Sequence, residues 1–181
     1  ADTGYDTLRL TESGQTLDLT AILDADLQGF EVIDITGTGD NSLKLSVAKV
    51  LNLSSTTNTL RVLHNEGDVL SYGGGWKVEL PQIINSQFVH TLRRIKSDAT
   101  DEDATIEVAN TFAFQNPYLP LDVNHDGTVA PIDALIIINR LNDSGPGALG
   151  TPTSVVGLTE FFYFDANGDQ AVAPIDVLVV I

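Results

Sequence analysis

Two copies of one pattern, D-x-N-x-D-x-x-V-A-P-I-D, begin at Asp122 and at Asp165, 43 residues apart. Oxygen-bearing side chains at positions 1, 3 and 5, a main-chain carbonyl at position 7 and a carboxylate at position 12 are the ligand spacing of a calcium loop. Calcium takes about six to eight hard oxygens at about 2.3–2.6 Å, and this spacing wraps a chain around one ion. Because an apolar run follows each copy, we predict two units that each consist of a cation-binding loop and a helix.

The two loops differ at position 6, which is Gly127 in the first and Gln170 in the second. A left-handed backbone is expected there, and it costs a residue other than glycine about 1 kcal/mol. We therefore expect two Ca²⁺ ions, with the second site strained or weaker, and a short strand pairing between Val129 and Val172 at position 8. The predicted ligands are Asp122, Asn124, Asp126, the Thr128 carbonyl and Asp133 in the first loop, and Asp165, Asn167, Asp169, the Ala171 carbonyl and Asp176 in the second.

The apolar run after each loop predicts a helix, over Pro131–Asn142 and from Pro174 to Ile181. Proline is well placed in a first helical turn, because its missing N–H has no intrahelical partner there. The first helix is apolar nearly all round, so one face remains available for another domain or for a partner. The predicted partner-binding residues are Pro131, Ile132, Leu135, Ile136, Pro174, Ile175 and Leu178.

A duplicated loop of this kind that leads into an apolar helix, without an entering helix, resembles a dockerin. The resemblance covers residues 117–181 and implies two units related by a pseudo-twofold axis that bind a cohesin module. Two departures stand out, namely the long loop 143–160 between the repeats and the Pro-Ile pairs at positions 10 and 11. The P-I-D-A-L form is similar to dockerin-type repeats in large surface proteins of bacteria without cellulosomes, such as planctomycetes.

Residues 1–112 have a different pattern, in which short runs alternate apolar and polar residues and turn residues separate the runs. Alternation with period two indicates half-buried strands. Even spacing of about nine to ten residues is typical of a β-solenoid or β-roll, and a β-sandwich would give the same alternation. We therefore predict an α+β chain of two domains, an all-β domain at 1–112 and the loop–helix pair at 113–181. The predicted strands include residues 7–11, 16–20, 31–36, 43–47, 50–53, 60–62, 69–70, 76–78, 88–90 and 105–108.

Two segments of this half, Gly4–Leu8 and Gly37–Leu43, resemble degenerate RTX-type nonapeptides, and the half as a whole is similar to β-rich modules of secreted adhesins. A full calcium β-roll would need consecutive G-G-x-G-x-D repeats, and these are missing, so the resemblance leaves open whether this half holds a calcium site. Trp76, Tyr72 and Tyr5 are candidates for a carbohydrate-stacking platform. We expect Trp76 to be a core or cap residue instead.

The composition excludes several kinds of partner. With 9 Lys and Arg against 25 Asp and Glu, the net charge is −16, so the chain lacks the basic surface that nucleic acid or anionic lipid requires. It contains no cysteine, which excludes disulfides and thiolate zinc sites, and no apolar stretch long enough for a membrane span. The chain begins at Ala1 and has no methionine, so we expect a processed or excised piece whose signal peptide is gone.

The sequence also argues against an enzyme. The three histidines, His64, His90 and His125, have no companion residues spaced for zinc, and there is neither a G-x-S-x-G elbow nor a P-loop. We therefore predict a non-catalytic, calcium-binding interaction module that is secreted or on a bacterial surface, with a cohesin-like protein as partner. Copies of the chain joined head to tail in a filament, or a carbohydrate-binding adhesin module with the dockerin as its anchor, are the alternatives.

Overall fold

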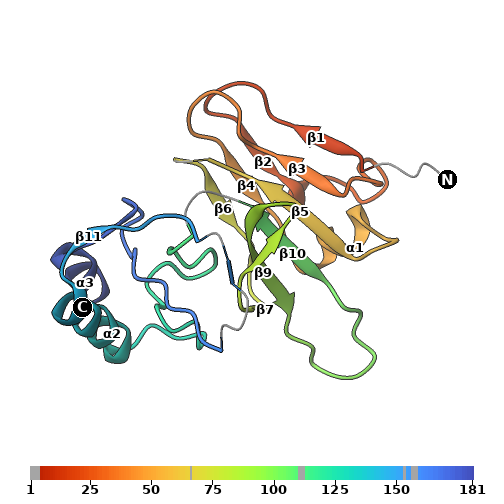
Figure 1. The fold of residues 1–181 in the computed structure, drawn as a ribbon. Helices are drawn as coiled ribbons and strands as arrows, with labels where there is room; N and C mark the ends of the chain where they lie inside the picture. Colours follow the sequence, from red (N-terminus) through yellow and green to blue (C-terminus); the bar gives the residue numbers. More distant parts are fainter. Residues whose placement is uncertain (1–4, 66, 110–112, 153, 156–158) are drawn as a thin grey trace. The chain divides into compact units, whose positions relative to one another are not determined.

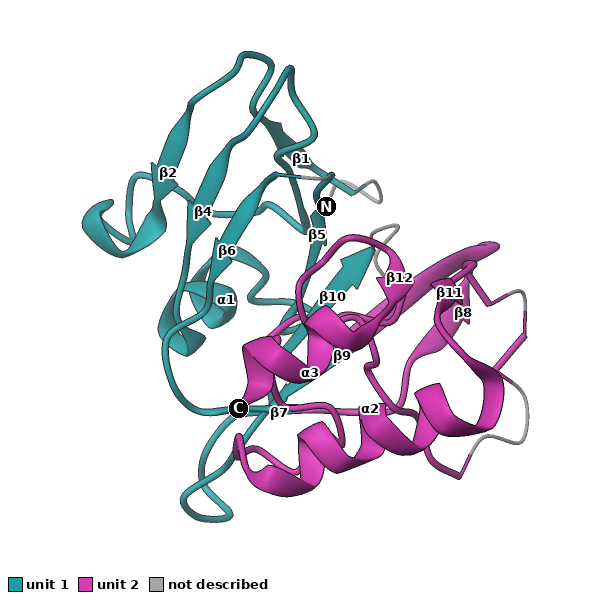
Figure 2. Cartoon of the chain, turned by 90° about the vertical axis from the view of Figure 1, so that its left-hand side faces the viewer, with its two compact units in different colours: residues 1–77, 91–110 teal, residues 78–90, 111–181 magenta. Residues whose placement is uncertain are grey.

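The computed structural model describes residues 5–65, 67–109, 113–152, 154–155 and 159–181. The chain divides into two compact units (Figure 2), unit 1 with residues 1–77 and 91–110 and unit 2 with residues 78–90 and 111–181. The fold is mixed, with a β-rich N-terminal half and few helices. Gly4 and residue 112, the predicted end of the first domain, lie outside the described residues.

Unit 1 is built from two parallel sheets that the chain enters alternately (Figure 1). The register aligns Leu8 with Ile33 and Ile33 with Val62 in the first sheet, and Leu17 with Leu43 in the second. Apolar side chains of successive strands therefore stack in rows. In spatial order the parallel strands are β1 (Thr7–Arg9), β3 (Val32–Asp34), β5 (Thr59–Leu63) and β10 (Thr105–Ala109) in the first sheet, and β2 (Thr16–Asp18), β4 (Ser42–Lys44) and β6 (Val69–Ser71) in the second.

Three further strands complete the larger sheet. β9 (Gln87–Arg94) follows β10 in the strand order and β7 (Trp76–Val78) follows β9, while β8 (Gln82–Ile84) pairs with β9 as an antiparallel hairpin. The division between the units passes through β7 and β9, so that β8 and residues 87–90 of β9 belong to unit 2.

A buried asparagine links segments of unit 1 that are distant in the sequence. Asn41 precedes β4, and its Oδ1 accepts from the Gln15 N–H at 2.9 Å while its Nδ2 donates to the Ile35 carbonyl at 3.1 Å. Its own N–H donates to Asp68 Oδ1, which lies one layer further along, at 2.8 Å. The side chain thus supplies the donors and acceptors that the main chain lacks where it leaves one strand for the next.

Helix α1 (Val47–Leu53) replaces strands that the sequence predicted over 43–47 and 50–53. Those predictions are wrong beyond Lys44, where β4 ends. Val50 and Leu53, three residues apart, are both buried, which places them on one face of a helix. The short apolar run fits both the period of a helix and that of a strand, and tertiary packing selects the helix.

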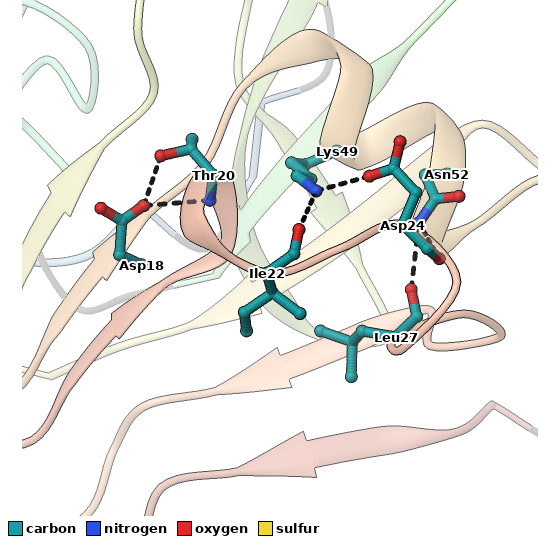
Figure 3. A network of polar contacts seen from close by, with 7 residues as sticks. All are labelled: Asp18, Thr20, Ile22, Asp24, Leu27, Lys49 and Asn52. Atoms are coloured by element: carbon teal, nitrogen blue, oxygen red, sulfur yellow. Dashed lines mark hydrogen bonds and ion pairs between the residues drawn. The ribbon is translucent and has the colours of Figure 1, made fainter.

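Two polar side chains of α1 hold the loop that follows the short 3₁₀ helix Leu19–Ala21 (Figure 3). The Lys49 Nζ donates to the Ile22 carbonyl and to Asp24 Oδ1. The Asn52 Nδ2 donates to the carbonyls of Asp24 at 3.1 Å and Leu27 at 3.0 Å. One amide group therefore satisfies two carbonyls of an irregular segment.

Asn52→Ala is expected to lower the free energy of unfolding of unit 1 by about 1–3 kcal/mol, because both carbonyls lose their donor. Urea denaturation followed by Trp76 fluorescence measures this change, with the exposed Thr56→Ala as the control. Equal midpoints for the two variants would show that water replaces the Asn52 amide without cost.

The aromatic residues proposed as a stacking platform do not form one. Trp76 and Tyr72 are both buried, and the Trp76 Nε1 donates to the Tyr72 carbonyl at 3.0 Å. Tyr5 alone is open to solvent, with 79% of its surface exposed. The platform prediction is therefore wrong for Trp76 and Tyr72, and the expectation of a core role for Trp76 is confirmed.

Unit 2 contains two helices that pack against each other (Figure 2), α2 (Pro131–Ser144) and α3 (Pro174–Val180). Helix α2 continues beyond the predicted Asn142 and ends at Gly145, whose φ of 72° suits glycine. One buried core cluster of the unit contains Val123, Ile137, Ala166 and Val172, and Ile136, Leu141, Phe162, Phe164, Val177 and Val180 are among the half-buried residues packed against it.

The expected pairing of Val129 with Val172 is wrong. Val172 lies in β12 (Ala171–Val172), which pairs antiparallel with β11 (Gly147–Ala148), so that Val172 is opposite Gly147. The long segment between the repeats thus supplies the strand that the predicted geometry assigned to the first loop. Val129 is exposed.

Candidate metal centre

The position-12 carboxylate organises the first loop. Asp133 is fully buried in the first turn of α2, and its Oδ1 accepts from the N–H groups of Val123 at 2.8 Å and Asn124 at 3.2 Å. Its Oδ2 accepts from the Ala130 N–H at 2.8 Å. The helix start is therefore joined to both ends of the loop that precedes it.

The carboxylates at positions 1 and 5 are held in the same way. Asp122 is buried and accepts from the N–H groups of Asp126 at 3.2 Å and Gly127 at 2.9 Å. Asp126 is oriented by Asn124 Nδ2 at 2.9 Å and by Thr128 Oγ1 at 2.7 Å. Each predicted side-chain ligand of the first loop thus has its orientation fixed by neighbours within the loop.

The second loop repeats this arrangement. Asp176 is fully buried and accepts from the N–H groups of Ala166 at 2.9 Å, Asn167 at 3.2 Å and Ala173 at 2.8 Å. Asp165 accepts from three loop amides, and Asn167 Nδ2 donates to Asp169 Oδ2 at 2.9 Å, as Asn124 does to Asp126. At positions 1, 3, 5 and 12 the two loops therefore carry the same residue types, and these side chains form similar hydrogen bonds.

Position 6 has the expected backbone in both loops. Gly127 has φ 92° and Gln170 has φ 63°, so the prediction that Gln170 adopts a left-handed conformation is confirmed. Glycine adopts this region without steric cost, whereas glutamine does not. The second loop therefore carries backbone strain at position 6, whereas the first carries it at position 4, where His125 has φ 48° and the second loop has Gly168.

Two loop carboxylates occupy an environment that is unfavourable to their own charge. Burial raises the pKa of Asp122, and repulsion from Asp133 and Asp126 adds to the increase. The pKa of Asp165 is also raised, mainly by burial, with repulsion from Asp176 as a smaller contribution. In the part of the chain that the structure describes, no Lys or Arg forms an ion pair with these carboxylates. A bound cation would supply the missing positive charge, so the residues fit Ca²⁺.

The donor set is mixed. Among the described residues, no group of three or more His, Cys, Asp or Glu side chains that could hold a metal ion by itself is found. The predicted set also needs the amide oxygens of Asn124 and Asn167 and the carbonyls of Thr128 and Ala171. Such combinations of carboxylate, amide and main-chain oxygen suit calcium, whereas thiolate and imidazole donors suit transition metals.

The raised pKa values of Asp122 and Asp165 predict that calcium affinity falls on acidification at a higher pH than it would with ordinary aspartates. Protons compete for these two carboxylates at a higher pH than for an ordinary aspartate, because each pKa lies above 3.8. Without calcium, the quantity that changes is the stability of the folded state, and it changes in the opposite direction. The folded state binds more protons than the unfolded state, so these two groups make it less stable as the pH rises through the raised pKa. Isothermal titration calorimetry in steps from pH 7 to pH 4 measures the effect, and a constant affinity over this range would contradict it.

The C-terminal part of the chain has a family assignment. Residues 120–181 match the family model of the dockerin type I domain. Dockerin type I domains bind calcium and attach one protein to another through a cohesin partner, and they are not catalytic. The predicted resemblance of residues 117–181 to dockerins is confirmed. No curated protein and no solved structure matches the chain, and the resemblance of the N-terminal half to RTX-type modules stays a prediction.

Most of the predicted partner-binding residues of the dockerin domain are exposed. Ile132, Leu135, Ile175 and Leu178 are large apolar residues on the surface of α2 and α3, and Pro131 and Pro174 are exposed beside them. Ile136 instead packs against the core of unit 2 and does not belong to this surface.

The structure shows further residues beside the predicted partner-binding residues that were not predicted from the sequence. A groove of about 580 Å³ is lined by apolar side chains of α2 together with Val129 and the end of the chain. Pro131, Ala134, Leu135 and Ile138 follow the helical period along one side, so this period was a signal for Ile138 in the sequence. The lining residues are Val129, Ala130, Pro131, Ala134, Leu135, Ile138, Val180 and Ile181.

Proposed function

We propose that the chain is a non-catalytic attachment module that binds one Ca²⁺ in each dockerin loop and a cohesin-like protein on the apolar surface of α2 and α3. The observation that carries this proposal is the pair of matched loops, in which buried carboxylates are oriented by main-chain amides and, among the described residues, form no ion pair with Lys or Arg. The first site is proposed to use Asp122, Asn124, Asp126, the Thr128 carbonyl and Asp133. The second is proposed to use Asp165, Asn167, Asp169, the Ala171 carbonyl and Asp176.

The loops and the apolar surface are mechanically connected. Asp133 and Asp176 lie in the first turns of α2 and α3, so the ions would fix where both helices begin. Without the ions, repulsion between carboxylates loosens the helices that present Leu135 and Leu178. Calcium binding is therefore expected to be a condition for partner binding. Each loop contains one residue other than glycine at positive φ, His125 in the first and Gln170 in the second, so this strain does not rank the two sites.

We infer that unit 1 is a β-solenoid-like scaffold that displays the dockerin domain. Support comes from the alternation of the chain between two parallel sheets and from the aligned leucine and isoleucine rows. Proteins with dockerin domains are typically extracellular or on the cell surface, and we propose the same location for this chain on a bacterium. Calcium is millimolar there, so both loops would be filled. Within the described residues, no helix is both long and apolar enough to cross a bilayer.

The proposed function is tested by binding and by size. The full chain is passed over an immobilised panel of cohesin modules in calcium and again in excess chelator, and its molar mass is measured by light scattering under both conditions. Calcium-dependent retention by a cohesin, with a monomeric mass, supports the proposal. Calcium-dependent growth of the mass with no retention would replace it with self-assembly, and no calcium response in either measurement would refute it.

A further inference from the structure

The segment immediately before the matched dockerin residues contacts both loops. The Phe114 carbonyl accepts from the N–H of Asp165, position 1 of the second loop, at 3.0 Å. Two residues later, Asn116 Nδ2 donates to the carbonyl of Asp122, position 1 of the first loop, at 2.8 Å. Gln115, between them, lies against Gly168 of the second loop so closely that a Cβ there would be 2.7 Å from its Nε2.

Asn116 is fully buried, and both the oxygen and the nitrogen of its side-chain amide form hydrogen bonds. Oδ1 accepts from the N–H groups of Tyr118 at 3.0 Å and Leu119 at 3.1 Å, which closes a local turn. Serine or aspartate can accept such local bonds equally well. Only the bond from Nδ2 to Asp122 requires an amide donor, and that bond sets where the first loop begins.

A second set of contacts joins the same elements. The Phe114 ring stacks on Phe161, with centroids 5.2 Å apart and an interplanar angle of 14°. Tyr163 lies between Phe161 and the second loop, and its N–H donates to the Val123 carbonyl of the first loop at 2.9 Å. The segment that leads into the second loop is therefore bound both to residues 114–116 and to the first loop.

We propose that residues 114–116 are a brace that couples the two calcium loops, with Asn116 as a positioning residue for the first loop. The inference rests on the proposed calcium binding at both loops. An ion in the first loop orders Asp122, Asn116 and Phe114 in turn, and Phe114 holds the start of the second loop. By linkage, each ion then raises the affinity of the other loop by the same factor.

Calcium titration of the full chain, followed by the amide NMR signals of Gly127 and Gln170, measures the calcium affinity of each loop separately. The test variant is Asn116→Ser, which keeps the local turn but does not reach Asp122, and the control is Asn142→Ala on the exposed end of α2. We expect roughly tenfold weaker binding in the first loop, as one buried hydrogen bond is lost. We also expect at least about threefold weaker binding in the second loop, which Asn116 does not touch.

The possible outcomes distinguish a failure of the proposed coupling from a failure of the proposed calcium binding. A loss confined to the first loop, or no loss in either, overturns the coupling while leaving calcium binding intact. Wild-type loops that do not respond to calcium overturn the proposed function, and the brace with it. Far-UV circular dichroism checks that α2 and α3 are formed. If Asn116→Ser lacks their signal, Asn116→Thr gives the same decision, because its hydroxyl also accepts the local bonds and is too short to reach Asp122.

Discussion

Asp133→Ala is expected to weaken calcium binding at the first loop at least about a hundredfold and to lower the free energy of unfolding in saturating calcium by about 3–5 kcal/mol. A hundredfold loss of affinity alone removes about 2.7 kcal/mol of linkage stabilisation. The buried N–H of Val123 also loses its acceptor, which costs about 1 kcal/mol or more, whereas the part-buried N–H groups of Asn124 and Ala130 can bond to water instead.

Calorimetry and urea denaturation measure the two effects. Asp176→Ala should repeat them in the second loop, because its three amide donors match those of Asp133 within 0.1 Å. Asp143→Ala is the control, since this carboxylate is exposed in the last turn of α2. If Asp133→Ala and Asp143→Ala bind calcium equally well, position 12 is not a ligand and the loops are only turns that cap the helices.

The twelve-residue loops could be predicted from the sequence because every group that defines them is local. Asp122 and Asp133 are separated by one loop, and ligand spacing fixes the chain conformation without reference to the rest of the fold. The helix starts were equally accessible, since Pro131 and Pro174 occupy first-turn positions. Even the left-handed backbone of Gln170 follows from its position in the repeat.

Features that depend on partners distant in sequence were not accessible. The residues of α1 alternate well enough for a strand, and the burial of Val50 and Leu53 against other segments selects a helix. The association of residues 78–90 with the C-terminal unit involves Phe88 and His90, whose rings contact Phe161 and Tyr163 more than 70 residues away. No local pattern marks such a contact, and the same holds for the bond from the Asp165 N–H to the Phe114 carbonyl.

A negative charge in the apolar surface is expected to abolish partner binding without unfolding the domain. Leu178 in α3 has 67% of its surface exposed, and Leu135 in α2 is also exposed, so the fold loses little when either is replaced. In an interface core, a desolvated and unpaired carboxylate is costly, and Leu178→Asp or Leu135→Asp should reduce affinity for the cohesin-like partner at least about a hundredfold. Calcium affinity should change by less than about twofold for either variant.

The pair of variants is needed because a carboxylate at Leu178 lies near the C-terminus of α3, where the helix dipole makes negative charge unfavourable by about 0.3–1 kcal/mol. Leu135 lies in the first half of α2 and is free of this effect. Ser55→Asp in unit 1 adds the same charge at an exposed position and controls for the change in net charge. Binding by surface plasmon resonance that is lost in both leucine variants but kept in Ser55→Asp locates the interface on the two helices. Binding kept in both would place the partner elsewhere, and calcium would then act on stability alone.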